Sequence, residues 1–190
     1  MAKFFGNLHL VLVAGLVFAI AVMMHFGEAV TVDTNSVFRW LHVFFGILWI
    51  GLLYYLNFVQ VPTMPAIPAE QKGAITGHIA PKVFFFFRYA ALLTVITGLV
   101  VAYVAGYVHQ ALAFQGEAQV QLIGLGMWLA LIMAFNVWFI IWPAQKKILG
   151  IVEATAEEKA AAAPRALYAS RTNTLLSLPM LYAMVSANLG

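Results

Sequence analysis

The chain of 190 residues contains no cysteine, and only 9% of its residues are charged. The absence of cysteine excludes disulfides, thiol chemistry, iron–sulfur clusters and the C-x-x-C-H attachment of a c-type haem. A soluble domain carries about 25% charged residues, so seven acidic and ten basic side chains are too few to solvate a globule of this length. Sparse charge also excludes a nucleic-acid-binding domain, and the high aliphatic content excludes intrinsic disorder. Phosphate-binding glycine loops, H-E-x-x-H and G-x-S-x-G motifs and paired intramembrane carboxylates are absent as well.

Apolar sequence is abundant: 64% of the residues are hydrophobic, and the mean hydropathy is +0.93. A membrane-spanning helix needs about 20 mostly apolar residues. We therefore predict an all-α integral membrane protein, a single membrane domain over residues 1–190. Its bundle of about five transmembrane helices is expected at approximately 4–26, 36–61, 82–108, 120–142 and 167–188. Four prolines in residues 62–81 exclude one continuous helix there, and the alanine-rich residues 153–163 are typical of a surface helix.

Basic residues are distributed unequally between the two sides of this topology. Those in loops on one side are Lys3, Lys72, Lys82, Lys146, Lys147, Lys159 and Arg165. The loops on the other side have none. By the positive-inside rule, the amino terminus is cytoplasmic and the carboxyl terminus external. Lys3 before an apolar run is also typical of a secretory signal, but the run is long enough to span, so we expect an uncleaved first helix.

Polar side chains share one face of the second predicted helix, with the small residues between them. At 100° per residue this stripe holds Arg39, His42, Gly46, Trp49, Leu53, Asn57 and Gln60. Lipid cannot satisfy such groups, so the stripe is expected to face the bundle. A similar line on the third helix holds Arg88, Ala91, Val95, Gly98, Ala102, Gly106 and His109. Its small residues allow close approach of another helix or of a flat cofactor.

Depth in the membrane sorts the polar residues into two layers. The outer layer holds His42, His25, His109 and Arg39. His42 lies deepest and is the best candidate ligand of an iron, with His25 or His109 as a second ligand; the alternative is a hydrogen-bonded packing histidine. The inner layer includes Arg88, Arg171, Asn57, Asn136, Asn173 and Gln145. Its two arginines need amide or carbonyl acceptors or a bound anion, unless their side chains snorkel to the interface.

Three segments of the sequence resemble the membrane domain of the bacterial cytochrome-c-linked urate hydroxylases (urate oxidases). They are residues 39–51 (RWLHVFFGILWIG), 136–147 (NVWFIIWPAQKK) and 170–184 (SRTNTLLSLPMLYAM). Arg88 weakly matches a basic residue of that family. The spacing of His42, Trp49 and Gly51 is also similar to a helix of membrane protoporphyrinogen oxidases, which bind haem b. The chain is identified as a short, diverged member that lacks the family's cytochrome c domain.

This resemblance implies a redox protein of the bacterial inner membrane that binds haem b and passes electrons to a separate cytochrome c. Family histidines are absent before Arg88, beside Asn173 and in residues 186–189, and the family's glutamate is Ala90 or Ala91 here. These departures favour the alternative, a non-catalytic subunit of a larger respiratory or photosynthetic membrane complex. Whether the chain is itself an enzyme stays open between the two readings.

Overall fold

The structure, a computed structural model, describes residues 2–26 and 33–187, and every regular element in them is a helix. By their internal contacts the residues form two compact units, Met1–Val37 and Phe38–Gly190. The expected all-helical fold is therefore confirmed for the described residues. The expectation of one membrane domain stays a prediction.

The smaller unit consists mainly of one apolar helix. Helix α1 covers Ala2–Phe5 and α2 covers Leu8–Phe26. The break between them is set by Asn7, whose side-chain oxygen accepts hydrogen bonds from the backbone N–H groups of His9 and Leu10 and so caps α2. Helix α2 is apolar on all sides and has no buried residue. A helix of this kind belongs in lipid or against a partner helix.

The larger unit begins with a helical hairpin that is longer than predicted. The first arm is continuous over Thr34–Ala66 and the second over Ala69–Val104. The first arm contains α3 (Thr34–Tyr54), η1 (Tyr55–Gln60), α4 (Val61–Thr63) and η2 (Met64–Ala66). The second contains η3 (Ala69–Gln71), α5 (Lys72–Ala74), η4 (Ile75–Ile79) and α6 (Ala80–Val104). The predicted interruption within 62–81 is confirmed, but it is confined to the extended residues Ile67 and Pro68.

Widened helical turns explain how the prolines fit into these helices. The three π-helical segments η1, η4 and η5 (Asn136–Ile141) each end two residues before a proline, namely Pro62, Pro81 and Pro143. The N–H after each segment bonds the carbonyl five residues earlier: Val61 to Leu56, Ala80 to Ile75 and Trp142 to Val137. Proline cannot donate to the carbonyl four residues before it and crowds that carbonyl. The wider turn relieves this conflict, so the helices continue through the prolines.

The turn after α6 differs from the predicted helix over 82–108. Helix α6 ends at Val104, and Gly106 then takes a left-handed conformation with φ of 80°. The short helix α7 (Val108–Leu112) follows and packs against α8 (Ala118–Phe135). Gly124 makes this contact possible, because a Cβ at that position would collide with the carbonyl oxygen of Ala111.

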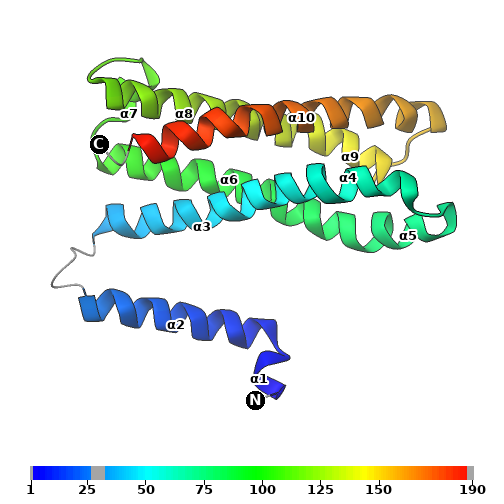
Figure 1. Ribbon diagram of the computed structural model, residues 1–190, viewed down its shortest axis with the longest axis horizontal. Coiled ribbons are helices and arrows are strands. Elements are labelled where there is room, and N and C mark those ends of the chain that lie inside the picture. Colours follow the sequence, from blue (N-terminus) through cyan, green and yellow to red (C-terminus); the bar gives the residue numbers. More distant parts are fainter. Residues whose placement is uncertain (1, 27–32, 188–190) are drawn as a thin grey trace. The chain divides into compact units, whose positions relative to one another are not determined.

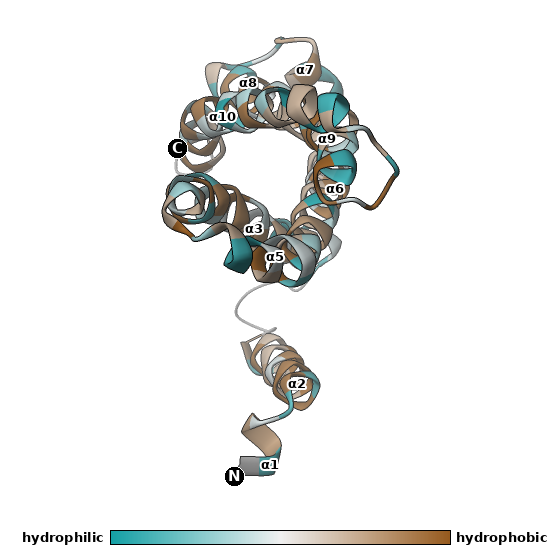
Figure 2. Ribbon diagram, turned by 90° about the vertical axis from the view of Figure 1, so that its right-hand side faces the viewer, coloured by the Kyte–Doolittle hydropathy of each residue, from teal (hydrophilic) through white to brown (hydrophobic). Residues whose placement is uncertain are grey.

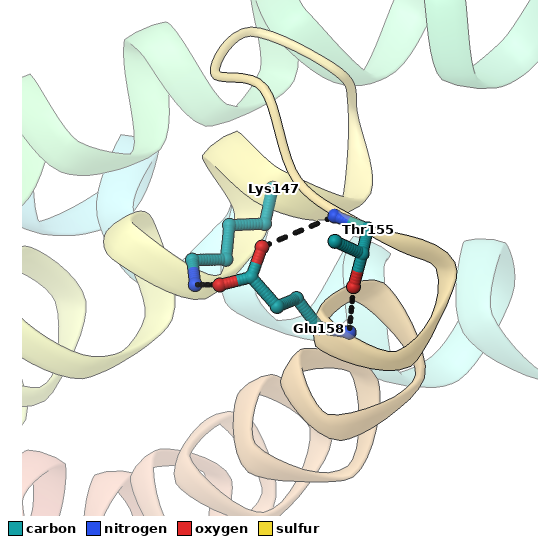
Figure 3. A network of polar contacts seen from close by, with 3 residues as sticks. All are labelled: Lys147, Thr155 and Glu158. Carbon is teal, nitrogen blue, oxygen red and sulfur yellow. Dashed lines mark hydrogen bonds and ion pairs between the residues drawn. The ribbon is translucent and has the colours of Figure 1, made fainter.

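The last two helices meet at a turn held by polar contacts. Helix α8 continues through η5 into α9 (Trp142–Ile148), and α10 covers Ala156–Ser186. Thr155 caps α10: its hydroxyl accepts from the N–H of Glu158, whose carboxylate accepts from the N–H of Thr155 (Figure 3). The same carboxylate pairs with Lys147 of α9 at 2.9 Å. The predicted surface helix and the predicted helix over 167–188 are thus one helix.

The long helices of the larger unit lie side by side in alternating directions (Figure 1), and seen end-on they surround a common axis (Figure 2). The main core contains Trp49, Leu53, Phe87, Met133 and Val137, which are at most 1% exposed. Small residues of α10 face the bundle at helical spacing and allow a close approach to α8 and α9; they are Ala162, Ala166, Ala169, Ser177 and Ala183.

Four helices in the described residues are long and apolar enough to cross a membrane: Leu8–Phe26, Thr34–Ala66, Ala69–Val104 and Ala118–Ile148. The chain is therefore a helical membrane protein suited to a lipid bilayer. Helix α10 is not among these four. A crossing by α10, the count of five and the orientation stay predictions.

Candidate functional site

His42 reaches from α3 to the backbone of α6. Its Nδ1 lies 2.8 Å from the carbonyl oxygen of Thr94. A carbonyl only accepts, so Nδ1 is the donor and carries the proton of the neutral ring. The other nitrogen, Nε2, then bears a lone pair, and no hydrogen bond to it is found in the described part of the chain. This arrangement suits both a packing histidine and a ligand whose second nitrogen is oriented by a carbonyl.

The ring of His42 lies directly over Gly98. A Cβ added to Gly98 would stand 2.7 Å from Cε1 and 2.9 Å from Nδ1 of the imidazole. The imidazole therefore contacts the small-residue line of the third predicted helix at Gly98. One turn further along α3, Gly46 faces Thr94 at an ordinary distance of 3.9 Å from its methyl group. The imidazole therefore occupies the space that a side chain at position 98 would need.

The two histidines predicted as second ligands are both exposed. His109 lies on α7 and is exposed, because α6 ends before it. His25 is exposed at the end of α2, in the smaller unit, with its ring against Phe26. Among the described residues no group of three or more histidine or acidic side chains forms a metal site. Their suggested role as second ligands stays a prediction.

Arg39 lies near the N-terminal end of α3 and interacts electrostatically with Tyr107. Burial raises the pKa of the Tyr107 hydroxyl, and the positive charge of Arg39 partly opposes this rise. Tyr107 follows the left-handed Gly106, so the turn after α6 brings an aromatic hydroxyl toward α3. Nothing in the predicted pattern singled out this tyrosine.

The amides of the inner layer join helices to one another. Asn136 donates to Asn173 at 2.9 Å, and Asn173 donates to the carbonyl of Met133 at 2.9 Å. Asn57 donates to the carbonyl of Leu53 and to the hydroxyl of Ser170. Asn57 and Asn173 are at most 1% exposed. The expectation that the polar stripe of the second helix faces the bundle is confirmed for Trp49, Leu53 and Asn57, which are buried, whereas Arg39 at the start of the stripe is exposed.

The two inner arginines have different surroundings. The guanidinium of Arg88 lies over aromatic rings, 3.8 Å from the centroid of Trp142, 5.2 Å from Tyr89 and 5.5 Å from Phe85. Its backbone carbonyl accepts from the indole of Trp138. Arg171 is exposed on α10. Aromatic faces, rather than the expected amides, therefore accompany the charge of Arg88.

Several buried polar atoms of the larger unit have no hydrogen-bond partner. Those found in the described residues are Nε1 of Trp49, Oδ1 of Asn57, Oε1 of Gln60 and Nη1 of Arg88. Most buried polar groups in proteins are paired, and three of these four lie on the polar stripe of α3 and η1. Gln145 is half-buried on α9. The sequence did not single out the hydroxyl partners of this layer, Ser170 and Ser177, because serine on a helix is usually unremarkable.

The family model described as "Urate oxidase N-terminal" matches residues 82–190, more than half of the chain. The chain belongs to this family. The match begins in α6 and includes Arg88, Asn136 and Asn173, so the resemblance read from residues 136–147 and 170–184 is confirmed. His42 lies outside the matched residues. Neither a curated protein nor a solved structure matches the chain.

Proposed function

We propose that this urate oxidase-related membrane domain is a redox protein of the bacterial inner membrane, which binds haem b through His42 and passes electrons to a separate cytochrome c. One observation carries the proposal: the bond from Nδ1 of His42 to the carbonyl of Thr94 leaves Nε2 as the basic nitrogen. A histidine ligand commonly has its second nitrogen fixed in this way, which sets the tautomer and the ring orientation.

In the larger unit, His42 is the residue that would hold haem. Nε2 of His42 would hold the iron, and the carbonyl of Thr94 would orient the imidazole by accepting the hydrogen bond from Nδ1. Bound haem would supply one-electron chemistry. In the described residues of this unit, no second histidine faces the bundle beside His42, since His109 is exposed and His78 lies in the inner half of the hairpin. Among the described residues of this unit, His42 would therefore hold the group without a second histidine.

The absorption spectrum, iron content and pyridine haemochrome of the detergent-purified chain test the proposal. We expect a Soret band in the wild type, its loss in His42→Ala, and its retention in His78→Ala, the matched control at an exposed histidine of η4. A wild type without iron or a Soret band refutes haem binding. Equal spectra in wild type and His42→Ala refute the assignment of His42.

The second candidate function is a non-catalytic subunit of a larger membrane complex. It is favoured by the use of polar side chains to join helices: Asn136 to Asn173, Asn57 to Ser170, and Tyr54 to Ser177 at 2.9 Å. The exposed apolar surface of α2 would contact the other subunits. Purification from native membranes in a mild detergent distinguishes the two functions, because a subunit co-purifies with partner chains and without its own haem.

A further inference from the structure

We propose that Gly98 is the positioning residue of His42. Because glycine has no side chain, it leaves a space, here called the seat, in which the imidazole reaches the carbonyl of Thr94 and keeps its proton on Nδ1. The inference deepens the proposed function, because the seat decides which nitrogen of His42 is available to a ligand. It rests on the contact of His42 in α3 with Thr94 and Gly98 in α6, so it does not require a bound cofactor.

Helix geometry explains why position 98 controls this hydrogen bond. In an α-helix the carbonyl of residue i points toward residue i+4, so the carbonyl of Thr94 lies beside Gly98. A side chain at 98 would cover that carbonyl on the face toward α3. A Cβ there would stand 2.7 Å from Cε1 and 2.9 Å from Nδ1 of His42, closer than nonbonded atoms approach. With any other residue at 98, the ring has to move away from the carbonyl.

Small-residue packing alone does not account for the contact. Gly46 lies on the same helix pair, and its added Cβ would meet the methyl group of Thr94 at 3.9 Å, an ordinary contact. If the glycines served only the approach of the helices, alanine would be tolerated similarly at both positions. If Gly98 is the seat, alanine at 98 acts on the histidine and alanine at 46 does not.

The chemical consequence is a fixed tautomer. A neutral imidazole has one N–H and one lone pair. While Nδ1 donates to Thr94 over 2.8 Å, the lone pair is on Nε2, where it can accept a proton or ligate a metal. When the ring leaves the seat, this bond no longer selects the tautomer, and ligation through Nε2 weakens, by about 10-fold or more as for other groups that orient a ligating histidine.

Nitrogen NMR of histidine-labelled protein in detergent tests the seat without any cofactor. At a pH where imidazole is neutral, we expect the resonance of His42, assigned by its loss in His42→Ala, to report a proton on Nδ1 in wild type and in Gly46→Ala. In Gly98→Ala we expect a mixture of tautomers. An unchanged His42 signal in Gly98→Ala, or an equal change in Gly46→Ala, would overturn the proposal.

A double-mutant cycle keeps the test decisive if Gly98→Ala folds poorly. Removing the ring removes the clash, so Gly98→Ala should destabilise the wild type and have little effect in the His42→Ala background. An equal loss in both backgrounds would contradict the seat. Haem content separates this inference from the proposed function: a wild type with the expected tautomer and no haem retains the seat and refutes the redox proposal.

Discussion

The side-chain amide of Asn136 donates a 2.9 Å hydrogen bond to Oδ1 of Asn173, and it does so from the first residue of the π-helical segment η5. Asn173 in turn donates to the carbonyl of Met133, one turn earlier on α8. Both asparagines are buried. The pair therefore ties α10 to the place where the α8 helix widens.

Replacing Asn173 by leucine should destabilise the protein, because the amide of Asn136 then has no acceptor. A buried unpaired polar group costs about 1–3 kcal/mol, and hydrogen bonds between membrane helices average about 0.6 kcal/mol. We expect a loss of about 1–2 kcal/mol in the free energy of unfolding, measured by denaturant titration in micelles. The exposed neighbour Thr172→Val serves as control, and the double variant Asn136→Leu/Asn173→Leu should recover part of the loss. A double variant less stable than Asn173→Leu alone would contradict the pairing.

The aromatic surroundings of Arg88 predict that lysine cannot replace it. A planar guanidinium stacks on rings, whereas an ammonium does not, and a desolvated cation–π contact is worth about 2 kcal/mol. Arg88→Lys should therefore lower the free energy of unfolding by about 1–2 kcal/mol. Arg88→Met keeps the length and removes the buried, unpaired Nη1, so it should lie within about 1 kcal/mol of wild type. Greater stability of the lysine variant than of the methionine variant would refute this account.

The sequence predicted which faces of the helices are buried better than where the helices end. The spacing of His42, Trp49 and Asn57 on one face was sufficient to predict that this face turns toward the bundle, because lipid cannot satisfy polar groups. The ends depended on Pro62, Pro81 and Pro143, which usually stop a helix but here follow π turns. No local signal in the sequence distinguishes these two outcomes.

The site was predictable in part for the same reason. Helical periodicity predicted the face of the helix on which His42 and Gly98 each lie, but their contact depends on how the two helices pack. The position of His109 was not predicted, because it depends on the left-handed turn at Gly106. The surroundings of Arg88 were also missed, since Trp142 comes from a helix whose register against α6 is set by packing rather than by sequence spacing.

The cap of α10 predicts a loss of stability in acid. The hydrogen bond from Lys147, the N–H of Thr155 and the charge of Lys147 hold the pKa of Glu158 below its usual range. A carboxyl whose pKa is lower in the folded state stabilises it above the unfolded pKa, about 4.3 for glutamate. This contribution is lost as the pH falls from there through the folded pKa. Proteolysis within residues 149–155 should rise over this range in the wild type and change less in Glu158→Gln.

Lys147→Met checks the cause of this shift. It removes the largest contribution to the lowered pKa, so the pKa of Glu158 in a carbon NMR titration should move up toward its ordinary value. Lys146→Met, the neighbouring lysine, is the matched control. An equal shift in both variants would assign the effect to general charge rather than to the ion pair.

The absence of cysteine makes the predicted topology directly measurable, because single cysteines can be introduced without removing others. Gly73, Glu117 and Glu153 are exposed and lie in or beside the connections between the long helices. With a cytoplasmic amino terminus, a membrane-impermeant maleimide applied to intact cells should label Glu117→Cys alone. Gly73→Cys and Glu153→Cys should react only after permeabilisation. Labelling of Gly73→Cys in intact cells would reverse the orientation. A cysteine added after Gly190 decides whether α10 crosses the membrane. With five spans it is labelled on the same side as Glu117→Cys, and with four spans on the same side as Glu153→Cys.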